Sequence, residues 1–147
     1  MARKPPEYWV SRLREFLSRN GISIDDTVLS RNRNVFLAGW RDKSKCIVAA
    51  GSTRIGFWGI QKSVVSMLGT KGHEWGALFL DMRPSGKCYW VDALNVTKVS
   101  DYSNATEYLF HAPVLEENWE LVQKIDVPNE VEFIRNFLTV VGLEADK

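Results

Sequence analysis

The sequence predicts a single domain of the α/β or α+β class, with a central mixed sheet of five to six strands flanked by helices. Three observations predict this class. Residues 75–82 and 88–96 are apolar, aromatic-rich runs joined by Arg83-Pro84-Ser85-Gly86, a combination typical of a tight turn. Apolar residues recur at helical spacing near both ends of the chain. The 147 residues, of which 45% are hydrophobic and 25% charged, are enough for one buried core.

The first helix is expected over residues 6–20. Pro6 suits the first position of a helix, and Gly21 suits the residue that ends one. Between them, apolar residues from Trp9 to Leu17 lie on one helical face. A possible first strand follows at residues 27–30, within a polar loop.

Two further strands, at 35–40 and 45–50, are predicted to form a hairpin through residues 41–44. Residues 54–60 read as an extended piece. Apolar residues from Ile60 to Leu68 then repeat at helical spacing, and Gly69 is expected to end this second helix.

The central hairpin is followed by a predicted loop at 101–106 and a short apolar piece at 108–110. Residues 113–124 fit either a helix or a loop. The last helix is expected over residues 130–141, with Asn129 as its cap and Glu132 three residues later. In the core we expect the hairpin aromatics to be buried, with helical residues packed onto the sheet: Trp75, Phe79, Tyr89 and Trp90, with Trp9, Leu13 and Phe137.

Cys46 and Cys88 fall inside predicted strands, and we expect them to be buried free thiols. The N-terminus lacks the apolar core of a secretory signal, and no apolar run reaches the ~20 residues of a membrane span. The expected location is therefore intracellular, in the cytoplasm.

The net charge of +1 hides a division along the chain. Residues 1–71 carry 13 of the 19 Lys and Arg but 5 of the 18 Asp and Glu, a net charge of +8. The remaining residues carry a net charge of −7. This asymmetry indicates either a polyanion-binding face or two halves that interleave and neutralise each other.

No complete catalytic motif is present. The phosphate-binding GxxxxGK[ST], GxGxxG and GxSxG patterns are absent, and Cys and His never occur at zinc-ligand spacing. His73 is interpreted as a surface turn residue. Asp81 and Asp92 flank the 83–86 turn, so pairing across the hairpin would bring them together, where they could bind Mg²⁺. The alternative is that both are solvated charges at the ends of the strands.

The predicted order of a helix, three strands, a second helix and a hairpin resembles the core of the PD-(D/E)XK nuclease superfamily, over roughly residues 7–99. Holliday-junction resolvases and restriction-endonuclease-like proteins look closest. Glu7 matches a glutamate near the start of the family's first helix, and residues 47–52 fall where its catalytic strand ends.

The resemblance also implies an aspartate at the start of one strand and (Asp/Glu/Gln)-x-Lys at the end of the next, which together bind the catalytic metal. This chain has Asn34-Val35 and Ala49-Ala50-Gly51 at those places. The fold is therefore expected without the usual catalytic motif.

Three functions follow. The first is nucleic-acid binding by a nuclease-like but catalytically degenerate protein. Such a protein could belong to a mobile element, a phage or a defence system, and it is expected to need no cofactor. Its phosphate contacts are expected in one groove from Arg31, Arg33, Arg41, Lys43, Lys45, Arg54 and Lys62.

The second function is that of an active Mg²⁺-dependent endonuclease with atypical carboxylates, the candidates being Glu7, Asp42, Asp81 and Asp92. The third is an immunity-type or inhibitor-type protein, whose acidic C-terminal half binds a protein partner; a homodimer is a further possibility.

Overall fold

The main sheet of the protein has six strands. The computed structural model describes residues 5–29, 32–52, 54, 56–72, 74–127 and 129–144. The strand order is β1-β2-β3-β5-β6-β9, and only the β3–β5 pair is parallel. The strands are β1 (Ser23–Asp25), β2 (Val35–Trp40), β3 (Lys43–Ala50), β5 (Trp75–Phe79), β6 (Gly86–Asp92) and β9 (Val122–Val127). The predicted mixed sheet is confirmed, within an α+β domain.

A second, three-stranded antiparallel sheet covers one face of the main sheet. It has the order β4-β8-β7, formed by β4 (Phe57–Gln61), β8 (Glu107–His111) and β7 (Tyr102–Ser103). The expectation that helices alone flank the central sheet is therefore wrong. The reason is that Trp58, Ile60 and Phe110 form an apolar face that is buried against the main sheet.

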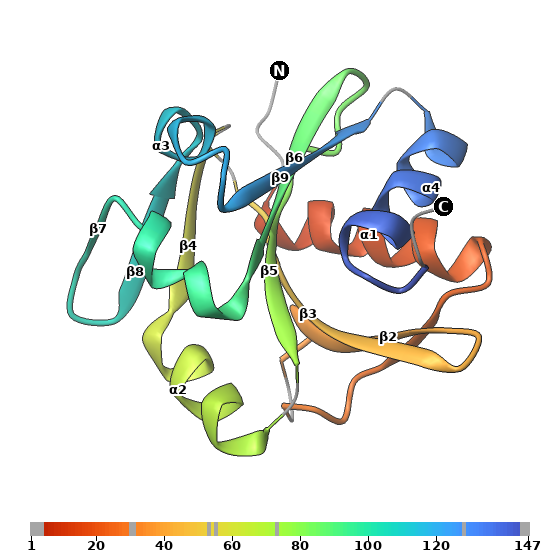
Figure 1. Cartoon of the computed structure of the whole chain (residues 1–147), viewed down its shortest axis with the longest axis horizontal. Helices are drawn as coiled ribbons and strands as arrows, with labels where there is room; N and C mark the ends of the chain where they lie inside the picture. The colour runs from red at the N-terminus through yellow and green to blue at the C-terminus, as the bar shows by residue number, and fades with distance from the viewer. Residues whose placement is uncertain are drawn as a thin grey trace.

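The helices complete the layers (Figure 1). α1 (Pro6–Arg19) and α4 (Glu130–Val140) cover the opposite face of the main sheet, whereas α2 (Lys62–Lys71) and α3 (Ala112–Glu117) lie with the second sheet. The short helices η1 (Ala93–Asn95) and η2 (Thr97–Val99) connect β6 to β7. Within the described ranges, no helix is long and apolar enough to cross a membrane.

Both faces of the main sheet are buried at its centre, along β5 and most of β3 and β6, which explains the nearly continuous apolar runs of these strands. Leu78 and Trp90 point toward α1 and α4, and Phe79 and Tyr89 point toward the second sheet. The predicted burial of the hairpin aromatics is confirmed, including Trp75, and Leu13 and Phe137 pack in the core with Trp9 partly buried.

Several predicted elements are confirmed in place: the first helix, strand 35–40, the central hairpin and the last helix. Asn129 caps α4 by accepting a hydrogen bond from the Glu132 amide at 2.9 Å. β3 begins at Lys43, two residues earlier than predicted, because a two-residue turn joins β2 to β3, and Arg41 has a positive φ of 56° there.

The predicted strand at 27–30 is wrong, and Ser30 lies outside the described residues. Asp25 ends β1 because its carboxylate accepts hydrogen bonds from the Thr27 amide at 2.9 Å and hydroxyl at 2.6 Å, which turns the chain.

The predicted bounds of the second helix are also wrong. Ile60 belongs to β4, and α2 continues past Gly69 to Lys71, where the left-handed conformation of Gly72 ends it.

The region between the central hairpin and α4 holds more regular structure than predicted. The expected strand at 88–96 ends at Asp92 and gives way to η1. The expected loop at 101–106 contains β7, and the apolar piece at 108–110 is the middle of β8. Residues 113–124 contain both α3 and the start of β9. This second half of the chain supplies two of the three strands in the second sheet.

Candidate functional site

A cleft of about 450 Å³ opens where the start of β2 and the end of β3 face β4, an edge strand of the second sheet. Apolar residues of β2, β3, β4 and α2 form part of its wall. Its polar side chains are those of Asn32, Asn34, Ser52, Gln61 and Glu107. Amides and a hydroxyl therefore dominate the polar lining, with one carboxylate.

Backbone contacts fix the strand ends that form the cleft. The Ala49 amide donates to the Asn34 carbonyl at 2.8 Å, which holds the start of β2 beside the end of β3. Gly51 lies so close to the Pro6 carbonyl that a Cβ atom would overlap it, so a glycine is needed where β3 meets the start of α1. Trp58 Nε1 donates to the Leu80 carbonyl at 3.1 Å and ties β4 to the main sheet.

Glu107 supplies the carboxylate at the cleft. The Asn104 side chain accepts from the Thr106 amide at 2.9 Å and from the Glu107 amide at 2.7 Å, which turns the chain into β8. The Glu107 carboxylate then lies over Gly59, where a Cβ atom would collide with it. It makes no ion pair with any described cation. One negative charge is therefore left unneutralised at the cleft.

The four carboxylates proposed for a nuclease do not meet. Glu7 lies in the first turn of α1, and Asp42 lies in the β2–β3 turn. Asp81 is bound to Arg83 at 2.8 Å beside the β5–β6 turn, whereas Asp92 pairs with Gly76 at the other end of that hairpin. The prediction that pairing brings Asp81 and Asp92 together is wrong, because the hairpin register separates them.

The cleft lacks the metal-binding motif that the resemblance implies. Mg²⁺ in such sites is usually held by one or two carboxylates together with substrate phosphates, and Glu107 is the one carboxylate among the cleft residues. Ala49, Ala50 and Gly51 line the cleft where the resemblance would require an acid and a lysine. Across the described parts of the chain, no three His, Cys, Asp or Glu side chains lie close enough to hold a metal ion.

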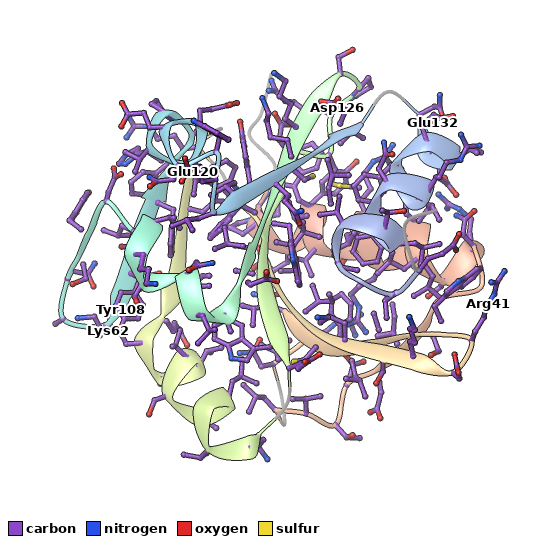
Figure 2. All side chains as sticks on the ribbon, in the orientation of Figure 1. Arg41, Lys62, Tyr108, Glu120, Asp126 and Glu132 are labelled. Atoms are coloured by element: carbon purple, nitrogen blue, oxygen red, sulfur yellow. The ribbon has the colours of Figure 1, made fainter. Side chains whose placement is uncertain are left out.

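The predicted basic residues do not share one groove. Arg31 lies outside the described residues, and the other six form three groups along the chain. Arg54 and Lys62 flank the ends of β4, Arg33 precedes β2, and Arg41, Lys43 and Lys45 belong to the β2–β3 hairpin. Figure 2 shows Arg41 and Lys62 at opposite ends of the molecule.

Local contacts decide which of these cations belong to the cleft. Arg33 lines a separate hollow with residues of α1, although its neighbours Asn32 and Asn34 line the cleft. Lys45 is paired with Glu74 at 3.6 Å. Arg54 and Lys62 lie on either side of the cleft-lining strand β4, and neither is in an ion pair with a described residue.

Both of these cations lie over aromatic rings. The Arg54 guanidinium carbon is 5.9 Å from the centre of the Phe57 ring, and Lys62 Nζ is 5.5 Å from that of Tyr108. These distances are typical of cation–π contacts, which position a cation without neutralising its charge. The two positive charges beside β4 therefore remain available to an anion.

Sequence reasoning missed a cluster on the second sheet. His111 Nδ1 is hydrogen-bonded to Asp101 Oδ2, and the His111 ring contacts Phe57 and Tyr102. The signal available in the sequence is the alternation of Glu107, Leu109 and His111 with two aromatic residues, which is typical of a strand with two different faces.

The two cysteines do not contribute a nucleophile. Cys46 and Cys88 are buried and unpaired, on opposite faces of the main sheet. Burial raises the pKa of Cys46 to about 11 and that of Cys88 to about 12, so both are thiols at neutral pH.

The features that remain for function are the polar cleft, the two cations and the aromatic cluster. No protein-family model, curated protein or solved structure matches the chain.

Proposed function

We propose that the protein binds nucleic acid along the cleft and the adjoining edge of β4, without cleaving it by a metal-dependent reaction. The observation that carries the proposal is the polar, amide-lined cleft at the start of β2 and the end of β3. The resemblance to the PD-(D/E)XK superfamily would place an active site at these strand ends. The order α1, β1, β2, β3, α2, β5 and β6 is compatible with that resemblance, with β4 inserted before α2.

The groups at the cleft suit a phosphodiester chain. Arg54 and Lys62 carry unneutralised charges, and contacts of such cations with phosphates supply most non-specific affinity for nucleic acid. The side-chain amides of Asn32, Asn34 and Gln61 offer both donors and acceptors, which can bond phosphate oxygens or base edges. The charges and the amides together fit a polyanion with hydrogen-bonding bases.

The same lining argues for binding rather than hydrolysis. Phosphodiester hydrolysis in metal-dependent nucleases relies on carboxylates that hold the ion and on groups that position the attacking water. Here Glu107 is the only carboxylate among the cleft residues, and Ala49, Ala50 and Gly51 offer no ligand side chain. We infer a nuclease-like fold whose cleft retains a surface for nucleic acid.

A gel-shift titration with a labelled duplex that ends in a single-stranded tail tests the proposal. The wild-type protein should shift this probe, and the affinity should fall as salt is raised. Glu107→Gln should strengthen binding by about two- to fivefold, because it removes a repulsive charge worth roughly 1 kcal/mol at close range in water. Glu120→Gln is the matched control: Glu120 is exposed beyond α3, and we expect no change in affinity.

Two results would overturn the proposal. Absence of any shift at low salt would exclude nucleic-acid binding. Cleavage of the probe that requires Mg²⁺, and that Glu7→Ala abolishes, would instead support the endonuclease alternative.

A protein partner is the second candidate, and one observation favours it. Trp119 is 72% exposed in the turn after α3, next to the exposed carboxylates of Glu117 and Glu120. Exposed tryptophans are enriched at the centres of protein interfaces. Binding of an arginine-rich peptide that Trp119→Ala abolishes, combined with no nucleic-acid affinity, would make this the better assignment.

A further inference from the structure

We propose that the outer face of the β4–β8–β7 sheet stacks unpaired bases, so that the preferred ligand is single-stranded nucleic acid. The bases would lie on the aromatic platform formed by Tyr102, His111 and Phe57. This inference rests on the proposed function and narrows it, because the cleft alone does not distinguish paired from unpaired strands.

The strand register places these rings on one face. Trp58, Ile60 and Phe110 point into the core, so the alternate residues of β4 and β8 point outward. Phe57 is directly opposite His111 in the β4–β8 pair, and Tyr102 is opposite Leu109 in the β7–β8 pair. Cross-strand partners share a face, so the platform spans three neighbouring strands.

The rings are in contact and accessible. Tyr102 is 55% exposed, and its ring centre is 6.3 Å from that of His111 with an angle of 28° between the planes. The Phe57 ring meets the His111 ring edge-on, with ring centres 4.5 Å apart and an angle of 62° between the planes, so Phe57 supports the His111 ring and the flat surface is that of His111 and Tyr102. Aromatic rings of this kind, exposed on a sheet, are the surfaces on which proteins stack unpaired bases.

Asp101 holds the central ring in place. Its Oδ2 is hydrogen-bonded to His111 Nδ1, and its backbone amide donates to the Leu109 carbonyl at 2.8 Å. The Asp101 side chain is 15% exposed, and its Oδ1 is buried without a hydrogen-bond partner in the described structure. The carboxylate therefore presents little surface to solvent. A ring fixed before binding loses little conformational freedom when a base stacks on it.

One cation, Arg54, adjoins the platform, where it lies over the Phe57 ring. It is free of ion pairs with described residues, so a strand whose bases lie on the platform could place a phosphate near it. Lys62 instead lies over Tyr108, which is opposite the core-facing Ile60, and the carboxylate on the platform face is that of Glu107 at the far end of β8. In a duplex the faces of the bases are stacked on one another and cannot reach the rings. The platform should therefore prefer unpaired strands.

The test is fluorescence anisotropy with a labelled single strand and with its full duplex, both on the wild-type protein. We expect the single strand to bind at least about fivefold more tightly. Tyr102→Ala should weaken single-strand binding by roughly 5- to 150-fold, the range for losing one base–aromatic stack. Tyr102→Phe keeps the ring and should bind nearly as well as the wild type. Trp119→Ala, which removes an exposed ring that belongs to the turn after α3 and not to a strand of this sheet, should leave the affinity unchanged.

The outcomes separate this inference from the proposed function. Equal binding of single strand and duplex, with no effect of Tyr102→Ala, would overturn the stacking platform and leave nucleic-acid binding intact. Loss of binding in both Tyr102 variants would also contradict it, because stacking does not need the hydroxyl. Failure of the wild-type protein to bind either probe would overturn both proposals.

Discussion

Arg14 and Asp26 form a charge pair with two hydrogen bonds between α1 and the loop after β1. Arg14 donates two hydrogen bonds to the Asp26 carboxylate, at 2.8 and 2.7 Å, and a third to the Arg33 carbonyl at 3.1 Å. Its guanidinium also lies over the Phe36 ring. One side chain of α1 therefore fixes both the loop after β1 and the approach to β2, next to the residues that line the cleft.

This pair gives a prediction about pH at the residue scale. The hydrogen bonds from Arg14 lower the pKa of Asp26, so the folded state favours the carboxylate form. That stabilisation is present above the unfolded pKa of about 3.9 and is lost as pH falls through the lower folded value. Urea unfolding midpoints of the wild type and of Asp26→Asn should differ at neutral pH and converge in acid.

Asp42→Asn is the control, since Asp42 lies in an exposed turn and makes no ion pair with a described residue. Its midpoint should follow that of the wild type at every pH. A constant difference between the wild type and Asp26→Asn down to the acid limit would show that the pair is not what stabilises this loop.

At the scale of elements, the hairpin of β5 and β6 holds the layers together. Trp90 is 1% exposed and packs with α1 and α4, and its Nε1 donates to Asp92 Oδ1 at 3.1 Å. Replacing a buried tryptophan by alanine typically costs about 3–5 kcal/mol. Trp90→Ala should therefore lower the free energy of unfolding by that amount, measured by urea denaturation.

Trp119→Ala provides the comparison, because Trp119 is exposed and should change stability by less than about 0.5 kcal/mol. An unchanged midpoint for Trp90→Ala would contradict the central position of the hairpin.

These elements also show what the sequence could predict. The two long helices and the hairpin are defined by local patterns: apolar spacing, the Asn129 cap and the turn before Gly86. The second sheet depends on β4 pairing with β8, which lies almost fifty residues later, and no local pattern specifies that pairing.

The candidate site was only partly predictable for the same reason. Arg54 and Lys62 are visible in the sequence, but their separation from Arg41 and Lys43 follows from the tertiary fold.

At the scale of the whole molecule, ion pairs join the basic N-terminal half to the acidic C-terminal half. Cations of the N-terminal half are paired with acids of the C-terminal half, as in Arg19–Glu130 at 2.7 Å and Lys45–Glu74 at 3.6 Å. Part of the asymmetry is therefore neutralised within the fold. The proposed function assigns the positive charge used for binding to Arg54 and Lys62 beside the cleft.

The most direct test compares two double variants that each remove two positive charges. Arg54→Ala with Lys62→Ala removes the cations beside β4, whereas Arg41→Ala with Lys43→Ala removes two from the β2–β3 hairpin. On the tailed duplex at low salt, Arg54→Ala with Lys62→Ala should weaken binding by about tenfold or more. It should also flatten the slope of the log association constant against log salt concentration by about 1.4 to 1.8, the contribution of two phosphate contacts. The second should keep nearly the wild-type affinity and slope. Equal losses in the two variants would mean that only total charge matters, and would contradict a binding site at the cleft.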